Sequence, residues 1–154
     1  MANYSIPQIL DMVHKAKTRE QKSQILKDND EFGLRAILQT AFHPEIEWLL
    51  PKGTPPYAAM PPSNDTPKGL YSEVKKFYLF TKGGGSDHLN TVKREQLFIQ
   101  MLEVLDPTEA KLVIDVKDKA IIGKYKGLTY KLVKDTWPDL LPDQTEWKQD
   151  TPEE

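Results

Sequence analysis

The stretch DPTEAKLVIDVK, from Asp106 to Lys117, decides the fold class of this chain. The Asp106 side chain can accept a hydrogen bond from the first turn of a helix, and Pro107 suits the first helical position because no partner is needed there for an N–H group. The apolar residues that follow recur at the spacing of one helix face: Leu112, Val113 and Val116. The stretch therefore predicts a helix that starts after Asp106 and closes at Ile121-Ile122.

The same apolar spacing returns through most of the chain. Thr18 and Gln21 form a capping-box pattern that opens one of these helices. The predicted stretches are 6–13, 18–26, a third opened by Asn29 or Asp30 and ended by His43-Pro44, 71–80, one from Asn90 or Thr91 to Leu105, and 128–137. Strand patterns are nearly absent. The prediction is an all-α protein, with six to eight helices packed as an irregular bundle.

One long interruption separates the predicted helices. Six of the seventeen residues from Pro51 to Pro67 are proline, and apolar periodicity disappears there. We predict a stiff surface loop and not a domain boundary, because neither side alone holds a full core. The expected organisation is one helical domain over residues 1–142 and an acidic C-terminal tail over 143–154.

Composition excludes several classes of protein. The chain of 154 residues contains no cysteine, which excludes a disulfide framework, a cysteine zinc site and a thiol nucleophile. No apolar run approaches the ~20 residues that span a bilayer, so no membrane partner is expected. The first residues lack the basic and apolar regions of a signal peptide, and we expect a cytoplasmic protein.

The net charge of −2 conceals two segments of opposite sign. Residues 117–134 contain six lysines and one acid, whereas residues 138–154 contain six acids and one lysine. Each lysine alone is typical of a solvated surface, but the cluster indicates an anionic partner. The acidic end could fold back and mask the basic segment, or it could serve solubility.

The run Lys82-Gly83-Gly84-Gly85-Ser86-Asp87 breaks the helical pattern. Such a run is typical of a flexible connector. Its backbone N–H groups could also cradle a phosphate.

Patterns of catalytic chemistry are missing. His14, His43 and His88 lie too far apart for a local metal-ligand spacing. Neither a Gly-x-Ser-x-Gly elbow nor a phosphate-binding loop ending in Gly-Lys-Ser/Thr occurs. We therefore predict a protein that is not an enzyme and needs no cofactor or metal.

Two stretches carry a resemblance. The first runs from Ile9-Leu10 through Thr18-Arg-Glu-Gln-Lys22 to Asn29. The second runs from Asp106 past a glycine turn at Gly127 to Trp137-Pro138 and Leu140-Leu141-Pro142. Both resemble the N-terminal helical DNA-binding domain of ATP-dependent DNA ligases, especially the short bacteriophage enzymes. In order of elements the resemblance spans residues 6–142.

The resemblance implies a bundle that encircles duplex DNA from the minor-groove side and holds its backbone. Ligases carry a Lys-x-Asp-Gly motif whose lysine takes the adenylate, and no lysine of this chain is followed by that pattern. Gly123-Lys-Tyr-Lys also stands where the family has a basic-Asp-hydrophobic turn. The resemblance therefore implies a stand-alone, phage-encoded relative of the binding domain without the catalytic domain.

The main functional prediction is a non-catalytic accessory protein that binds double-stranded DNA largely independently of sequence. Lysines neutralise phosphates without reading bases, and glycines let the backbone approach closely. One contact surface is predicted at Lys119, Lys124, Lys126, Gly127, Thr129 and Lys131. A weaker second surface is predicted at Lys82, Gly83, Gly84 and Ser86.

Two alternatives stay open. The chain could instead dock a protein, such as a phage virion component or a host replication or transcription protein, with Trp137 and Trp147 as anchors. In that case a virion location would replace the cytoplasm. It could also be a ligase subunit completed by a catalytic partner.

Overall fold

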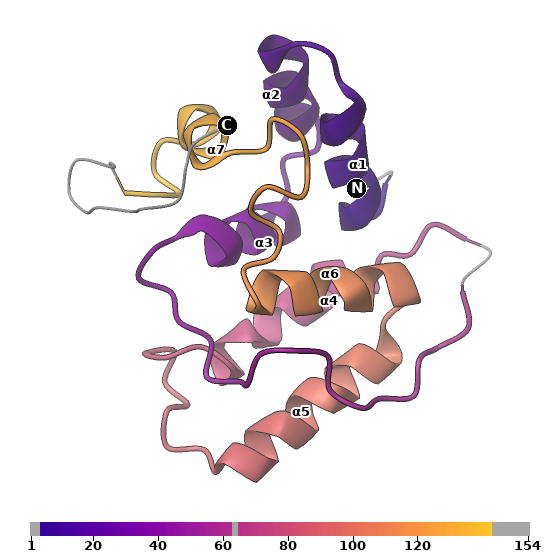
Figure 1. The fold of residues 1–154 in the computed structure, drawn as a ribbon, viewed down its shortest axis with the longest axis vertical. Helices are drawn as coiled ribbons and strands as arrows, with labels where there is room; N and C mark the ends of the chain where they lie inside the picture. Colours follow the sequence, from indigo (N-terminus) through magenta and orange to yellow (C-terminus); the bar gives the residue numbers. More distant parts are fainter. Residues whose placement is uncertain (1–3, 63–64, 143–154) are drawn as a thin grey trace.

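The computed structural model describes residues 4–62 and 65–142 (Figure 1). Within these residues the chain folds into seven α-helices and one 3-10 helix, with a single isolated bridge between Trp48 and Thr81. The helices are α1 (Ile6–Lys15), α2 (Arg19–Asp28), α3 (Phe32–Phe42), α4 (Gly69–Glu73), η1 (Val74–Leu79), α5 (Thr91–Val104), α6 (Pro107–Lys117) and α7 (Tyr130–Thr136). The predicted all-α class is confirmed.

Side-chain caps determine where most helices begin. The Thr18 hydroxyl accepts the N–H of Gln21, and the Gln21 side chain accepts the N–H of Thr18, as the capping-box pattern predicts. Ser5 and Gln8 form a second, unpredicted capping box at the start of α1. Three further helices, α5, α6 and α7, begin at the caps Asn90, Asp106 and Thr129.

The start of α3 differs from the prediction. Glu31 occupies the cap position without a side-chain cap hydrogen bond, and neither Asn29 nor Asp30 caps this helix. Asn29 ends α2 instead. The Asp30 carboxylate pairs with the guanidinium of Arg35 at 2.6 Å. That ion pair takes the carboxylate away from the helix start.

Three other boundaries are corrected. The helix expected at 71–80 begins at Gly69 and continues as a 3-10 helix from Val74. The α6 helix ends at Lys117 and does not reach Ile121-Ile122, since the chain turns through Lys119 with a φ of +59°. Leu128 precedes α7 because Thr129 caps it.

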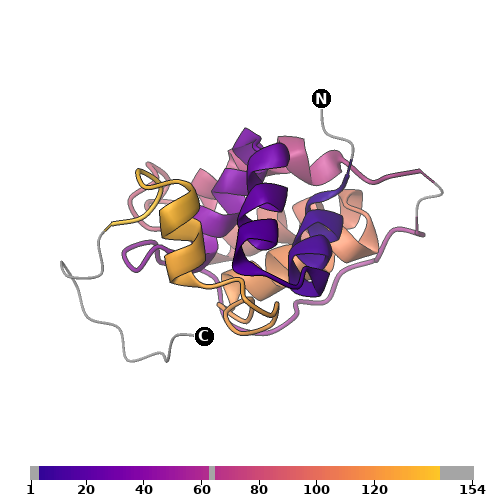
Figure 2. The same ribbon diagram turned by 90° about the horizontal axis from the view of Figure 1, so that it is seen from above.

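The helices form an elongated bundle (Figure 1). One end holds α1, α2 and α7, which pack against one another, and the other end holds α5. Between them α6 contacts α1, α3 and α5. Figure 2 looks along the long axis from the end that holds α1, α2 and α7.

One hydrophobic core extends along this bundle, from Ile6 to Leu141. An aromatic cluster forms its lower part: the Trp48 ring lies 5.1 Å from Phe77, 6.3 Å from Phe80 and 6.5 Å from Phe98. Among the described helices, none is long and apolar enough to cross a membrane.

Residues 51–62 of the proline-rich segment run over α5, just below α6, on the outside of this core (Figure 1). Its backbone is attached by side chains of those helices and of the turn after α6. The Glu103 carboxylate accepts the N–H of Ala58 at 2.9 Å, and Asp118 accepts that of Gly53 at 3.0 Å. Most of its described residues are exposed.

Candidate nucleic-acid interface

The lysines of the basic segment 117–134 do not all face outward. The ammonium of Lys119 donates to the carbonyl of Thr40 in the last turn of α3, at 2.6 Å, and burial there lowers the pKa of Lys119 to about 8. The ammonium of Lys124 pairs with Asp115 of α6 at 2.5 Å. The predicted contact surface is therefore corrected at Lys119, which attaches the segment to α3, whereas Lys124 is exposed but paired with a carboxylate.

The lysines at the two ends of the segment are also used internally. The Lys117 side chain is only 2% exposed, pairs with Asp118, and donates to two carbonyls of the proline-rich segment, those of Pro51 and Gly53. The ammonium of Lys134 donates to two carbonyls after α7, those of Pro138 and Leu141. Both lysines therefore stabilise loops.

The remaining predicted residues lie around the start of α7. Lys126 and Lys131 are exposed, and the Lys131 ammonium lies 4.0 Å from the Asp135 carboxylate. Thr129 accepts the N–H of Leu132, so its hydroxyl caps the helix. Gly127 has a φ of +78°, which favours glycine.

A buried lysine attaches this turn to the corner between α1 and α2. The Lys22 ammonium donates to the carbonyls of Val13 at 2.7 Å, Ala16 at 2.8 Å and Lys126 at 3.0 Å. The backbone N–H of Lys126 donates to Nδ1 of His14 at 2.8 Å. Figures 1 and 2 show the segment before α7 running beside α1 and α2.

This junction gathers exposed cations that are far apart in the sequence. Lys15, Lys17 and Arg19 are exposed at the α1–α2 corner, whose Ala16 carbonyl binds the same Lys22 ammonium as the Lys126 carbonyl. Arg19 and Lys131 share the Asp135 carboxylate, which lies 2.8 Å from the guanidinium. A second carboxylate, Asp11, pairs with Lys15 at 3.0 Å. We call this surface the basic end: Lys15, Lys17, Arg19, Lys126 and Lys131.

The sequence prediction missed three members of the basic end. Lys15, Lys17 and Arg19 form a short alternating run, and the Thr18 capping box places that run at a helix corner. A corner holds its side chains near one another on the surface. The sequence contains this pattern, but its position beside Lys126 depends on a contact across 104 residues.

The glycine-rich loop 82–87 is ordered by its own contacts. The Gly83 N–H donates to the Asp87 carboxylate at 2.8 Å, and the Gly84 N–H to the Thr81 carbonyl at 3.4 Å. The carbonyls of Ser86 and Asp87 accept from the buried guanidinium of Arg94. Two of the amides proposed for a phosphate cradle are therefore already used.

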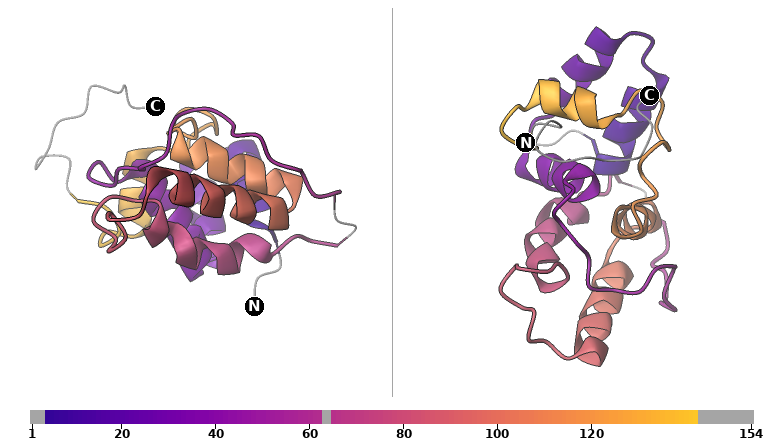
Figure 3. Two further views of the ribbon diagram at one scale, coloured as in Figure 1. Left: turned by 90° about the horizontal axis from the view of Figure 1, so that it is seen from below. Right: turned by 60° about the vertical axis from the view of Figure 1, so that its left-hand side comes forward.

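The other two residues of the predicted second surface, Lys82 and Ser86, differ in exposure. Ser86 is buried, whereas Lys82 is exposed and its backbone N–H donates to Glu47. The loop lies at the α5 end of the molecule, away from α1, α2 and α7 (Figures 1 and 3). The structure therefore does not bring the two predicted surfaces together.

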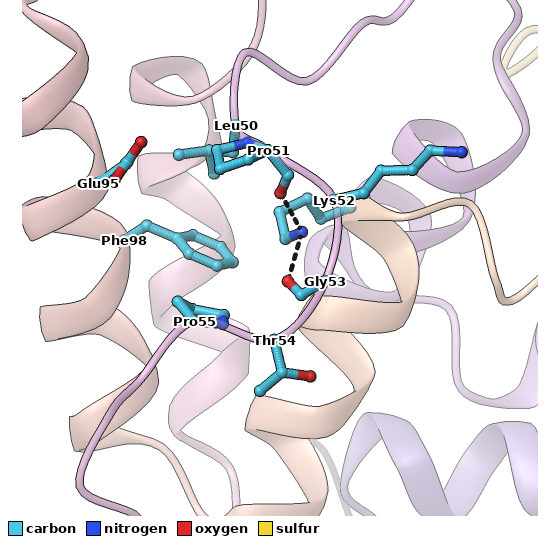
Figure 4. Close-up of a pocket in the computed structure, with 9 residues that line it drawn as sticks. Leu50, Pro51, Lys52, Gly53, Thr54, Pro55, Glu95 and Phe98 are labelled. Atoms are coloured by element: carbon cyan, nitrogen blue, oxygen red, sulfur yellow. Dashed lines mark hydrogen bonds between the residues drawn. The ribbon is translucent and has the colours of Figure 1, made fainter.

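A small pocket lies between the proline-rich segment and α5 (Figure 4). Phe98 points into it, and Pro51 and Pro55 line it from the other side. Its volume of about 80 Å³ is that of a few water molecules. The pocket is too small for a nucleotide.

Neither the histidines nor the described tryptophans add a site. Within residues 4–62 and 65–142, no group of three or more His, Asp or Glu side chains could hold a metal ion. Trp137 is buried, with the Arg35 guanidinium 5.2 Å above its ring, so it packs in the core. Trp147 lies outside the described residues.

Comparison with known proteins gives one match. Residues 9–123 match DUF6433, a family of unknown function. The chain belongs to the DUF6433 family. No curated protein and no solved structure matches it. The part of this DUF6433 chain that matches includes the α1–α2 corner and Lys22, and it ends before Lys126. The resemblance to DNA ligases stays a prediction.

Proposed function

We propose that this DUF6433 protein is a non-catalytic accessory protein that binds double-stranded DNA by its phosphate backbone, with the basic end as the contact surface. The observation that carries the proposal is the gathering of five exposed cations around one junction. They come from the α1–α2 corner, the turn before α7 and α7 itself. We place this activity in the cytoplasm.

The chemistry of the basic end favours phosphate contacts over base recognition. Four of its five cations are lysines, which act as point charges and read no base pattern. The single arginine is engaged with Asp135. Tyr125, the aromatic residue beside His14, is half-buried, so it offers no open face on which a single-stranded base could stack. A duplex therefore suits the surface better than a single strand.

The charges of the surface predict its salt dependence. Three of the five cations pair with two carboxylates, Asp11 and Asp135, so the surface keeps a net charge of +3, which is sufficient for about three phosphates. The logarithm of affinity should then fall against the logarithm of salt concentration with a slope of about −3. Between about 50 and 200 mM salt the affinity should fall about 40-fold.

A matched pair of charge reversals tests the proposal. Changing Lys15→Glu, Lys17→Glu and Lys126→Glu together should weaken binding to a short duplex by at least ~100-fold, measured by fluorescence anisotropy. The control carries Lys75→Glu, Lys82→Glu and Lys93→Glu, three exposed lysines that do not belong to the basic end. It has the same net charge and should stay within about threefold of wild type, because phosphate contacts are local. Equal losses in both variants would contradict the proposal.

A second candidate function is protein docking, favoured by one exposed aromatic side chain. Phe32, at the first position of α3, is 65% exposed, and exposed aromatic residues are frequent anchors of interfaces. If the wild-type chain retains no duplex at about 50 mM salt, docking becomes the better description. A Phe32→Ser variant should then lose a partner that the wild-type chain binds in direct titration.

A further inference from the structure

Lys22 has an unusual position for a lysine. Its side chain lies on α2 and the residue is 7% exposed. All three N–H groups of the ammonium find carbonyl acceptors, from Val13, Ala16 and Lys126. None of these acceptors is a carboxylate, so the positive charge is balanced by backbone dipoles. Two of them belong to the last turn and the cap of α1, where carbonyls carry partial negative charge.

The third acceptor, the carbonyl of Lys126, links the buried charge of Lys22 to the turn before α7. The carbonyl of Lys126 binds Lys22, and its N–H binds His14, so both polar groups of that residue's backbone are attached to the α1–α2 pair. The Lys126 side chain remains exposed. The point from which this side chain leaves the backbone is therefore fixed by two backbone hydrogen bonds.

Gly127 makes the close approach possible. A Cβ atom at this position would lie 2.5 Å from Cε and 2.7 Å from Cδ of Lys22. Its φ of +78° is also a conformation that other residues rarely adopt. The lysine and the glycine therefore fit each other across the junction.

We propose that Lys22 is a positioning residue of the basic end: it touches no phosphate itself, but it holds Lys126 beside Lys15 and Lys17 so that the three charges meet one stretch of DNA backbone. This inference rests on the proposed DNA-binding function. Burial, and to a smaller extent the positive charge of Lys126, lower the pKa of Lys22.

Three variants of the full chain test this role. Lys22→Met keeps an unbranched side chain that reaches to Cε, and it removes the ammonium with its three hydrogen bonds. Lys22→Arg keeps the charge, but a planar guanidinium cannot direct three donors from one nitrogen. Arg94→Met is the matched control, because Arg94 is also buried and also donates to three carbonyls, at the α5 end.

The measurements are duplex affinity across a salt series and hydrogen exchange of the Lys126 amide, at a temperature where every variant is folded by circular dichroism. Lys22→Met and Lys22→Arg should both lose about tenfold in affinity, the value of one phosphate contact at 0.1 M salt, and their slope should change from about −3 to about −2. Exchange of the Lys126 amide should accelerate in both. Arg94→Met should keep the wild-type slope.

The outcomes separate the two proposals. Wild-type affinity in both Lys22 variants, while the Lys15, Lys17 and Lys126 reversal abolishes binding, overturns the positioning role and leaves DNA binding in place. Wild-type affinity in Lys22→Arg alone also overturns it, because charge and not geometry would then be the cause. If none of these changes, the triple charge reversal included, alters duplex affinity, the proposed function itself is overturned. If Lys22→Met does not fold, Gly127→Ala displaces the same ammonium more gently, and it should reduce the slope in the same way.

Discussion

The turn 123–127 and the glycine-rich loop 82–87 look alike in sequence but differ in what surrounds them. Both contain lysine and glycines with positive φ, and a buried cation donates to carbonyls at each. Arg94 attaches the loop through carbonyls at most fifteen positions away. Lys22 attaches the turn across 104 positions, and thereby brings Lys126 to a corner that already carries cations.

The comparison teaches that glycine and lysine content alone does not identify a phosphate site. In the glycine-rich loop the amides of Gly83 and Gly84 are taken by the loop itself, and Asp87 adds a negative charge. At the turn 123–127, the α1–α2 corner supplies three more cations, Lys15, Lys17 and Arg19. The identity of the facing segment decides whether a basic loop is a binding surface.

The largest expected effect on stability comes from removing the cation of the glycine-rich loop. Arg94→Met should lower the free energy of unfolding by about 3 kcal/mol, because three carbonyls lose a charged donor. Urea denaturation followed by circular dichroism measures it. A loss below about 1 kcal/mol would show that the loop holds its conformation without Arg94.

The next prediction compares one glycine from each region. Gly127→Ala should cost about 2 kcal/mol, because positive φ is combined with a clash against Lys22. Gly83→Ala should cost about 1 kcal/mol, since its φ of +82° is similar but its Cβ would meet open space. Thermal unfolding of the two variants tests the difference. Equal losses would mean that the approach of Lys22 adds no constraint.

The smallest expected effect is a change in pH dependence at Lys119. Burial lowers the pKa of Lys119 to about 8 from its usual 10.5, so between these values the unfolded chain binds more protons than the folded one. Stability from this residue therefore rises as pH increases from 8 to 10.5. Relative to a Lys119→Met variant, the wild-type free energy of unfolding should gain about 1 kcal/mol, a value reduced because the side chain can shift toward water.

Chemical denaturation at several pH values measures that gain. The Lys119→Met variant is the control for the wild-type protein, because every other titratable group is present in both. Parallel pH profiles of wild type and variant would contradict the buried position of the ammonium.

Local features were predictable because their causes lie within a few residues. Asp106 and Pro107 start α6, and the Thr18–Gln21 capping box starts α2, as the sequence indicates. The prediction was wrong where a second local interaction competed for the same carboxylate. Asp30 binds Arg35 and leaves the start of α3 to Glu31.

The orientation of the lysines could not be predicted in the same way. Lys119 and Lys124 read as exposed charges in sequence, yet each finds an oxygen acceptor on another helix. An ammonium group is stable near the interior when carbonyl or carboxylate oxygens satisfy its donors. Those acceptors become known only when the helices are placed.

The sequence by itself determined an all-α chain, the starts of α2 and α6 and the basic character of residues 117–134, because helix periodicity, capping and charge are local properties. Tertiary structure alone decided which of those lysines turn inward and which meet Lys15, Lys17 and Arg19. The physical reason is that a buried cation needs oxygen acceptors around it, and at Lys22 these come from segments a hundred residues apart.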